Sequence, residues 1–306
     1  MLRTLVRGAA GAAIAAGIVA PLVRRKFRLP PAVVTAAVAA APFGLAVLKP
    51  RTKARDVGLY ALQMWGFTMA HELPYDDPER LRQRLRIQYP IRADRALGLG
   101  ELPTVRLQRA LSRDGEPTAL DRALSAIHWA WFLEPHSTLL YLLLRDERRF
   151  ARAARQMSAV YDLGCVVYAT VPTAPPWWAS ERGHTGSPVR RIMVEVGEDF
   201  WGRAWPAMYS SLGGNPWAAM PSLHFGSSVM AAILLAESGP GAGTAGWAYA
   251  SALGLALVYL GEHYLIDLIA GAALVAAVRV GDPLAAPLAG VISRAVQRLE
   301  RFSKGG

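Results

Sequence analysis

The sequence predicts an all-α, polytopic membrane protein, with a six-helix transmembrane bundle that carries the catalytic site and extra apolar helices at the N-terminus. Hydrophobic residues make up 53% of the 306 residues, and they occur in long blocks, as membrane spans require. The formal net charge is +11, and arginines flank the blocks. Cations in such positions fit an anionic bilayer surface better than nucleic acid, so we expect a membrane-embedded protein that binds no nucleic acid.

Eight apolar blocks are visible along the chain. The first two form an N-terminal addition, and the last six form the predicted bundle. Several blocks are shorter than the ~20 residues that a full span needs, so their ends are approximate. The blocks are residues 8–23, 31–48, 57–71, 120–144, 152–171, 221–236, 245–262 and 264–280.

The blocks divide the chain into three predicted parts. Residues 1–56 form an apolar hairpin or anchor, residues 57–280 the catalytic transmembrane domain, and residues 281–306 a basic cytoplasmic tail. The basic start and the alanine-rich run that follows it also resemble a signal peptide. Pro21 and the basic residues 24–26 follow at once, which favours an uncleaved anchor or hairpin.

The arginines of the short loops predict the orientation. Five arginines between residues 145 and 155 fill the turn between two blocks, and such turns face the cytoplasm. Residues 172–220 then lie outside, and the blocks that begin at Pro221 and near His263 both begin on the outer side. We therefore predict a multi-pass protein of the plasma (inner) membrane with an extracytoplasmic site. Two basic stretches in the first 118 residues disagree with this orientation, so the N-terminal topology stays open.

The first segment that carries candidate catalytic or binding residues is Asn215-Pro-Trp-Ala-Ala-Met-Pro-Ser-Leu-His224, at the outer start of an apolar block. Pro221 suits the first position of a helix. The free amides of a first helical turn lie at the positive end of the helix dipole, which favours a phosphate. We therefore expect an anion site beside Ser222 and His224.

The second segment is Gly261-Glu-His263-Tyr-Leu-Ile-Asp267. Residues four apart on a helix share a face, so Asp267 can bond one ring nitrogen of His263 and leave the other free as a nucleophile. A carboxylate inside a membrane span needs such a partner. Either segment alone is more often structural than catalytic. Together, in a chain with only six histidines, they predict a functional site.

Three segments, at residues 171–178, 221–224 and 263–267, together resemble the type-2 phosphatidic acid phosphatase superfamily. Pro221-Ser-Leu-His224 is similar to its second motif, and His263 to Asp267 is similar to the end of its third. The leucine before His224, the tyrosine after His263 and the segment Val171-Pro-Thr-Ala-Pro-Pro-Trp-Trp178 are similar to one branch, the fungal inositol phosphorylceramide synthases and their bacterial relatives. The resemblance covers roughly residues 57–280.

The resemblance implies a six-helix bundle, no metal or other cofactor, and a phosphohistidine intermediate. It implies that His263 is the nucleophile, Asp267 its orienting partner and His224 the acid and base. The expected substrate is a lipid-linked phosphate (phospho-inositol, phospholipid or prenyl phosphate), and the expected acceptor is a polar alcohol or water. A transferase is favoured over a lipid phosphate phosphatase, and a non-enzymatic lipid transporter is a further alternative.

A zinc hydrolase is a rival interpretation, because His224, His263 and Asp267 could supply three zinc ligands. Activity that resists chelators would reject it. The identities of the donor lipid and of the acceptor, and the oligomeric state, stay open.

The sequence departs from the superfamily pattern in its cationic phosphate contacts. The first motif, Lys-x6-Arg-Pro, is absent, and the Ser-Arg of the third motif would fall at Ala256 and Leu257. Side chains of the outer loop could replace these contacts, and Trp177 and Trp178 are expected to anchor that loop or to contact acyl chains. The candidate substrate-binding residues are Asn215, Ser222, His184, Arg190, Arg191, Trp177 and Trp178.

Polar side chains also interrupt the block at residues 120–144. His128, Glu134, Pro135 and His136 all fall within it. Polar groups at membrane depth are candidates for function, whereas a kinked helix with polar groups near an interface would explain them equally well. We leave them out of the predicted catalytic set.

Overall fold

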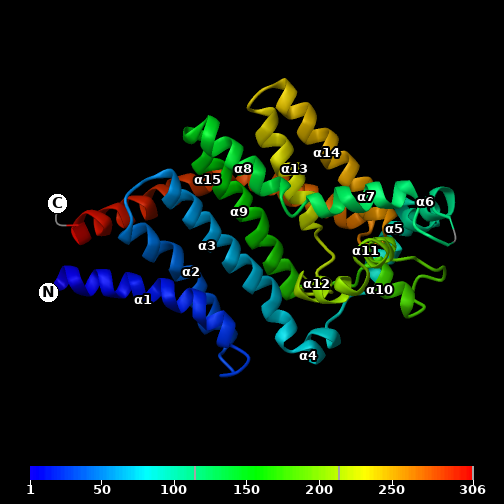
Figure 1. The fold of residues 1–306 in the computed structure, drawn as a ribbon, viewed down its shortest axis with the longest axis horizontal. Helices are drawn as coiled ribbons and strands as arrows, with labels where there is room; N and C mark the ends of the chain where they lie inside the picture. The colour runs from blue at the N-terminus through cyan, green and yellow to red at the C-terminus, as the bar shows by residue number, and fades with distance from the viewer. Residues whose placement is uncertain (114, 213, 305–306) are drawn as a thin grey trace. The chain divides into compact units, whose positions relative to one another are not determined.

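The structure, a computed structural model, describes residues 1–113, 115–212 and 214–304 (Figure 1). Every regular element in these ranges is a helix, which confirms the predicted all-α class. The last two residues of the predicted tail lie outside the described residues.

The chain forms two compact units. One comprises Met1–Asp76 with Arg279–Gly306, and the other comprises Asp77–Val278. The predicted three-part division, with boundaries at residues 56 and 280, stays a prediction.

The first unit begins with an apolar helical hairpin. Helices α1 (Leu2–Val23) and α2 (Pro31–Leu48) pack against each other. Close approach requires glycine on both sides, because a Cβ atom at Gly44 would lie 2.4 Å from the Ala10 carbonyl oxygen and one at Gly17 would lie 2.5 Å from Ala41 Cβ. Among the described residues, α1 and α2 are the two helices that are long and apolar enough to cross a membrane, judged by length and composition.

Helix α3 (Lys53–Glu72) and the short 3₁₀ helix η1 (Leu73–Asp76) follow. The buried Arg24, just after α1, joins this hairpin to the end of α3. Its guanidinium lies 2.9 Å from the Glu72 carboxylate and 2.7 Å from the Asp76 carboxylate. The first unit is completed by the last part of α15 (Leu265–Lys304), where Glu300 lies 3.3 Å from Arg55.

The second unit is built around α13, in which nine of the fourteen residues are buried. Helices α8, α9 and α14 pack against it, and Figure 1 shows α13 and α14 as neighbours in yellow and orange. The helices of this unit, besides the first part of α15, are α4 (Pro78–Gln83), α5 (Gln88–Leu97), α6 (Pro103–Leu111), α7 (Ala119–Ala130), α8 (Glu134–Arg145), α9 (Glu147–Thr170), α10 (Pro176–Glu181), α11 (Ile192–Trp201), η2 (Gly202–Ala204), α12 (Trp205–Leu212), α13 (Leu223–Ala236) and α14 (Pro240–Tyr259).

Each of the last six apolar blocks coincides with helical structure, but the block at 120–144 is two helices. Helix α7 ends at Ala130 and α8 begins at Glu134. Pro135 explains the break, because proline has no N–H to donate and its ring obstructs the preceding turn. The apolar helix α13 has 14 residues, fewer than a full span needs. The six-span bundle therefore stays a prediction.

Three segments far apart in sequence are joined by isolated parallel bridges. Thr173 pairs with Arg86 on one side and with Ala218 on the other. The Thr173 amide donates to the Trp217 carbonyl at 2.8 Å, and the Arg86 amide donates to the Pro172 carbonyl at 2.8 Å. These bonds hold the proline-rich segment after α9 beside the loop that leads into α13.

Candidate active site

The first turn of α13 places His224. Ser222 is the N-cap, and its hydroxyl accepts a hydrogen bond from the Phe225 amide at 3.2 Å. The helix therefore begins at Leu223, so Pro221 precedes it and does not occupy the first helical position that the sequence predicted. The Ser222 amide donates to the main-chain carbonyl of Asp267 at 2.9 Å. This bond fastens the start of α13 to the start of α15.

A tight turn between α14 and α15 places His263. The amides of Glu262 and His263 both donate to the Leu257 carbonyl at 3.1 Å. Gly261 has a φ of +82°, and a Cβ atom there would lie 2.6 Å from the Arg190 carbonyl oxygen. Only glycine suits this position, because the backbone is left-handed and another chain segment lies against it.

The predicted pair of His263 and Asp267 forms, but not on one helix face. His263 lies in the turn, two residues before α15 begins, and Asp267 lies in the first helical turn. The Asp267 Oδ2 atom lies 3.3 Å from His263 Nδ1 and accepts the Tyr264 amide at 2.9 Å. Asp267 is fully buried, so its carboxylate is positioned rigidly by the turn as well as by the histidine.

The two histidines contact each other directly. His224 Nδ1 lies 3.2 Å from His263 Nε2. A carboxylate facing Nδ1 favours the tautomer of His263 that carries its proton there, which leaves a lone pair on Nε2. In this assignment His224 Nδ1 is the donor, so the three side chains form one proton-linked row of His224, His263 and Asp267.

His128 and Trp131 complete the wall around His224. Their ring centroids lie 5.1 Å and 4.1 Å from that of His224. His128 is buried, and its Nδ1 atom has no hydrogen-bond partner among the described residues. His128 is not in the predicted catalytic set. Its signal in the sequence is a polar residue within an apolar block, and this signal does not reveal the ring contact between His128 on α7 and His224 on α13.

Arg191 contacts the turn that carries His263. Its Nε atom lies 3.1 Å from the Glu262 carboxylate, directly before His263. The guanidinium stacks on Trp177 at 3.7 Å from the ring centroid and also contacts the Tyr209 hydroxyl. The Trp177 ring therefore holds the Arg191 guanidinium in place, which gives this predicted substrate-binding tryptophan a structural role.

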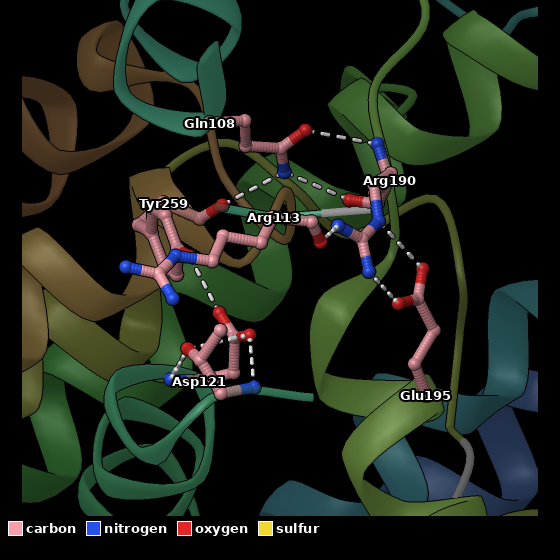
Figure 2. Close-up of polar contacts among 7 residues, drawn as sticks. Gln108, Arg113, Asp121, Arg190, Glu195 and Tyr259 are labelled. Carbon is pink, nitrogen blue, oxygen red and sulfur yellow. Dashed lines mark hydrogen bonds and ion pairs between the residues drawn. The ribbon is translucent and has the colours of Figure 1, made fainter. Parts of the chain in front are cut away.

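The other predicted substrate-binding side chains are engaged elsewhere or lie apart. Arg190 pairs with Glu195 and with the Arg113 carbonyl (Figure 2). Trp178 is buried against Trp217. The remaining two are Asn215, whose Oδ1 accepts the Trp217 amide at 3.0 Å, and His184, which is exposed and has no contact with the histidine pair among the described residues.

A buried glutamine, which sequence analysis missed, fixes the backbone beside Arg191. Gln108 Nε2 donates to the Arg190 carbonyl at 2.9 Å and to the Tyr259 carbonyl at 2.8 Å, while Oε1 accepts the Arg190 amide at 2.9 Å (Figure 2). The amide thus ties the segment before α11 to the end of α14. Since Arg191 follows Arg190 and His263 follows Tyr259 closely, Gln108 fixes the spacing between Arg191 and the turn that carries His263.

Replacing Gln108 with alanine is expected to destabilise the protein by about 2–4 kcal/mol, because one buried and two part-buried backbone groups lose their partner. The measurement is the melting temperature in detergent, followed by tryptophan fluorescence. The matched control is Gln83→Ala, which removes an exposed glutamine. Equal melting temperatures for the two variants would contradict the role given to Gln108.

Asp94, from a distant part of the chain, caps the start of α15. Its Oδ1 atom accepts the Ile266 amide at 2.9 Å, and the residue is fully buried. Burial raises the pKa of Asp94 to about 6, and the charge of Asp267 adds to this, although the bond from Ile266 acts in the opposite direction. The folded protein therefore binds this proton more tightly than the unfolded chain does.

This shift predicts a pH-dependent stability. The contribution of a protonated Asp94 is fully present below its ordinary value of 3.8 and is lost as the pH rises through about 6. Asp94→Asn keeps an oxygen for the Ile266 amide but has no charge, so it should melt at a higher temperature than wild type at pH 7.5 and show a smaller advantage at pH 5. The control is Asp199→Asn, which alters an exposed carboxylate. A pH-independent difference for Asp94→Asn would contradict this account.

His224, His263 and Asp267 are not arranged as three ligands of one metal ion. No group of three or more His, Cys, Asp or Glu residues in the described parts of the chain could hold a metal ion. Asp267 faces Nδ1 of His263, whereas His224 faces Nε2 on the other side of the ring. The carboxylate is therefore directed away from the space between the two histidines.

Comparison with known families gives a match that spans most of the second unit. A family model described as the PAP2 superfamily matches residues 91–280, which include both histidines and Asp267. No curated protein and no solved structure matches the chain at a significant level. Because the matched region covers more than half of the sequence, the chain belongs to the PAP2 superfamily.

Proposed function

We propose that the protein is a membrane enzyme that transfers or hydrolyses a lipid-linked phosphate through a phosphohistidine on His263. The observation that carries the proposal is the row formed by His224 Nδ1, His263 and Asp267, with separations of 3.2 and 3.3 Å. Membership of the PAP2 superfamily supports lipid phosphatase or phosphotransferase chemistry in general.

In the first step, the lone pair of His263 Nε2 attacks phosphorus and the bond from phosphorus to the departing oxygen breaks. His224, protonated on both ring nitrogens, gives its Nδ1 proton to that oxygen. Phosphorus has to take the position in front of Nε2 that His224 Nδ1 holds in this structure. Asp267 balances the positive charge that develops on the His263 ring.

In the second step, neutral His224 removes a proton from the acceptor hydroxyl. The acceptor oxygen then attacks phosphorus, the bond between phosphorus and His263 Nε2 breaks, and both histidines return to their first state. Water as the acceptor gives a phosphatase. A polar alcohol, such as inositol, gives a phosphotransferase.

The phosphoryl oxygens need positive partners, since the family's usual cations are missing from their motif positions. We assign this role to the free amides at the start of α13 and to Arg191. The position of Arg191 beside Glu262 supports the assignment, because Glu262 precedes the nucleophile directly.

The structure is compatible with a multi-pass membrane protein. Helix α9 has 24 residues, so it is about 36 Å long at 1.5 Å per residue, which by length alone exceeds a hydrocarbon core of about 30 Å. Its charged residues, apart from Asp162, gather in its first three turns. Large apolar side chains on several helices of the second unit are exposed, which is typical of a surface that faces lipid. They are Leu140, Leu144, Leu163, Val166, Trp247, Leu255 and Ile269.

We propose further that the site faces the extracytoplasmic side of the inner membrane. The arginine cluster at the end of α8 and the start of α9 (Arg145, Arg148, Arg149, Arg152 and Arg155) supports this orientation, because arginine-rich segments between spans face the cytoplasm. Arg149 and Arg152, in the first two turns of α9, contact Glu237, the residue after α13. His224 lies in the first turn of α13, so the histidines and this arginine cluster lie at opposite ends of α13.

We favour a transferase of the inositol phosphorylceramide synthase type, with a lipid phosphate phosphatase as the alternative. This preference rests on the resemblance of residues 171–178 and 221–224 to that branch. A non-enzymatic lipid transporter is the further alternative, and the row of histidines and aspartate argues against it.

The test is a product analysis of the purified protein. Radiolabelled phospholipids and prenyl phosphates are supplied with and without inositol or other alcohols, each with and without a chelator. A labelled phospho-alcohol that appears only with the alcohol identifies a transferase, and free phosphate identifies a phosphatase. Absence of every product would overturn the enzyme proposal, and loss of activity with the chelator would favour the zinc rival.

A further inference from the structure

A cationic pocket lies outside the catalytic row. It has a volume of about 530 Å³ and is lined by the start of α5, the segment before it and the residue after α9. Its walls are apolar at Leu85, Ile87 and Val171, whereas Arg86 and Arg92 line it with positive charge. Neither guanidinium forms an ion pair or hydrogen bond within the part of the chain that the structure describes. Both arginines are exposed, so the pocket presents two available cations.

Arg84, two residues before Arg86, differs from this pair because its guanidinium is hydrogen-bonded. Arg84 donates to the carbonyl oxygens of Ala169 and Thr170, at the end of α9, so its guanidinium is already used. Unlike Arg84, Arg86 and Arg92 have no structural task among the described residues. Two unpaired arginines in an apolar pocket match an anionic group attached to an apolar body.

The pocket adjoins the loop that leads to His224. Tyr89, which lines the pocket, shares a hydrogen bond of 2.8 Å with the Thr173 hydroxyl and donates to the Met220 sulfur at 3.1 Å. Met220 directly precedes Pro221 and Ser222, and Ser222 bonds to the catalytic helix. A ligand in the pocket would therefore lie one side chain away from the segment that carries His224.

An apolar surface leads away from the pocket along α9. Leu163 and Val166 are 46% and 58% exposed, and Val171 at the pocket wall is 38% exposed. Leu163, Val166 and Thr170 lie on one face of the helix, since they are spaced by three and four residues. Hydrocarbon chains could lie along this face while a headgroup occupies the pocket.

We propose that this pocket binds the phosphate-bearing headgroup of an anionic bilayer lipid, with Arg86 and Arg92 contacting the phosphate and the acyl chains lying along α9. Charge complementarity and the exposed apolar side chains of Leu163, Val166 and Val171 select this occupant. The pocket's place beside the His224 loop makes it a capture site for lipid substrate, and that part of the inference rests on the proposed function.

The test is a chemical footprint that needs no turnover. The His263→Ala variant of the full chain, in detergent micelles, is treated with the arginine reagent phenylglyoxal, and modification of each arginine is followed by peptide mass spectrometry. Dioleoyl phosphatidic acid at ten times its dissociation constant should slow modification of Arg86 and Arg92 by about tenfold, because about one site in eleven stays free. Arg82, which is exposed and outside the pocket, serves as the internal reference.

Two further arms identify the ligand. Zwitterionic phosphatidylcholine and inorganic phosphate, at the same concentration, should give little protection. Equal protection by inorganic phosphate would show that the pocket binds a free anion and would overturn the lipid assignment. Equal modification of Arg86 and Arg92 with and without phosphatidic acid would overturn the proposal itself.

A kinetic arm separates this proposal from the proposed function. Replacing both Arg86 and Arg92 with glutamine should raise the KM for phosphatidic acid by about tenfold, the equivalent of 1.4 kcal/mol, with a smaller effect on nitrophenyl phosphate. The charge-matched control replaces Arg80 and Arg82. If phosphatidic acid protects Arg86 and Arg92 but the wild-type protein turns over no substrate, the lipid site stands and the proposed enzyme function is rejected. If the protein turns over substrate but the two arginines are not protected, the enzyme function stands and the lipid site is rejected.

Discussion

Replacing His263 with alanine is expected to reduce the turnover of a lipid phosphate by about 10⁴-fold or more, the scale of effect that follows from removing a nucleophile that forms a covalent intermediate. No neighbouring group can replace it. His224 faces the Nε2 atom of His263 and acts from the leaving-group side in the proposed mechanism, and Asp267 faces the Nδ1 atom of His263. The measurement is the rate of product release from purified protein in detergent.

Folding has to be checked in the same preparation, because His263 is buried and also bonds Asp267. The melting temperature and the elution profile of the variant should remain near those of wild type. His184→Ala is the matched control, since this exposed histidine lies in the loop between α10 and α11 and should retain activity. A His263→Ala protein that is folded and fully active would contradict the assignment.

His224→Ala should divide substrates according to their leaving groups. A lipid phosphate releases a poor leaving group that needs a proton, so its first turnover should slow by about 10²–10⁴-fold, the usual contribution of a positioned acid. A nitrophenyl phosphate ester needs little protonation, so its first turnover should lose much less. The variant His263→Ala should lose activity on both.

The measurement is the first-turnover burst of nitrophenol in each variant. Steady-state rates would obscure the difference, because His224 also activates the acceptor in the second step. Equal burst losses for the two variants would count against the division of roles. A burst that survives only in His263→Ala would show that the two roles are reversed.

The sequence predicted the parts of the site that depend on local patterns. The segments around His224 and His263 could be recognised because each carries its residues within a few positions. The prediction was less accurate on how they are held, since His263 lies in a turn and Pro221 lies before its helix. These differences arise from the hydrogen bonds of Ser222 and the left-handed Gly261, which short-range periodicity does not reveal.

Contacts between distant segments could not be predicted. Gln108 and Asp94 are single polar residues in the polar stretch between two apolar blocks, which includes α5 and α6. Both are buried and bond backbone groups next to the turn that carries His263. His128 joins the histidine pair only because α7 ends at Ala130 and packs near α13. Long-range positions of this kind are set by packing, and one sequence contains no direct signal for them.

The most direct measurement of the central claim is the identification of the phosphorylated residue. The protein is mixed with a lipid carrying labelled phosphate, quenched in alkali within the first turnover, digested and mapped by mass spectrometry. We predict an acid-labile label on His263 that is absent from His263→Ala. His224→Ala should still acquire this label when nitrophenyl phosphate is the phosphate donor. Label on His224, or continuing turnover with no labelled histidine, would contradict this prediction.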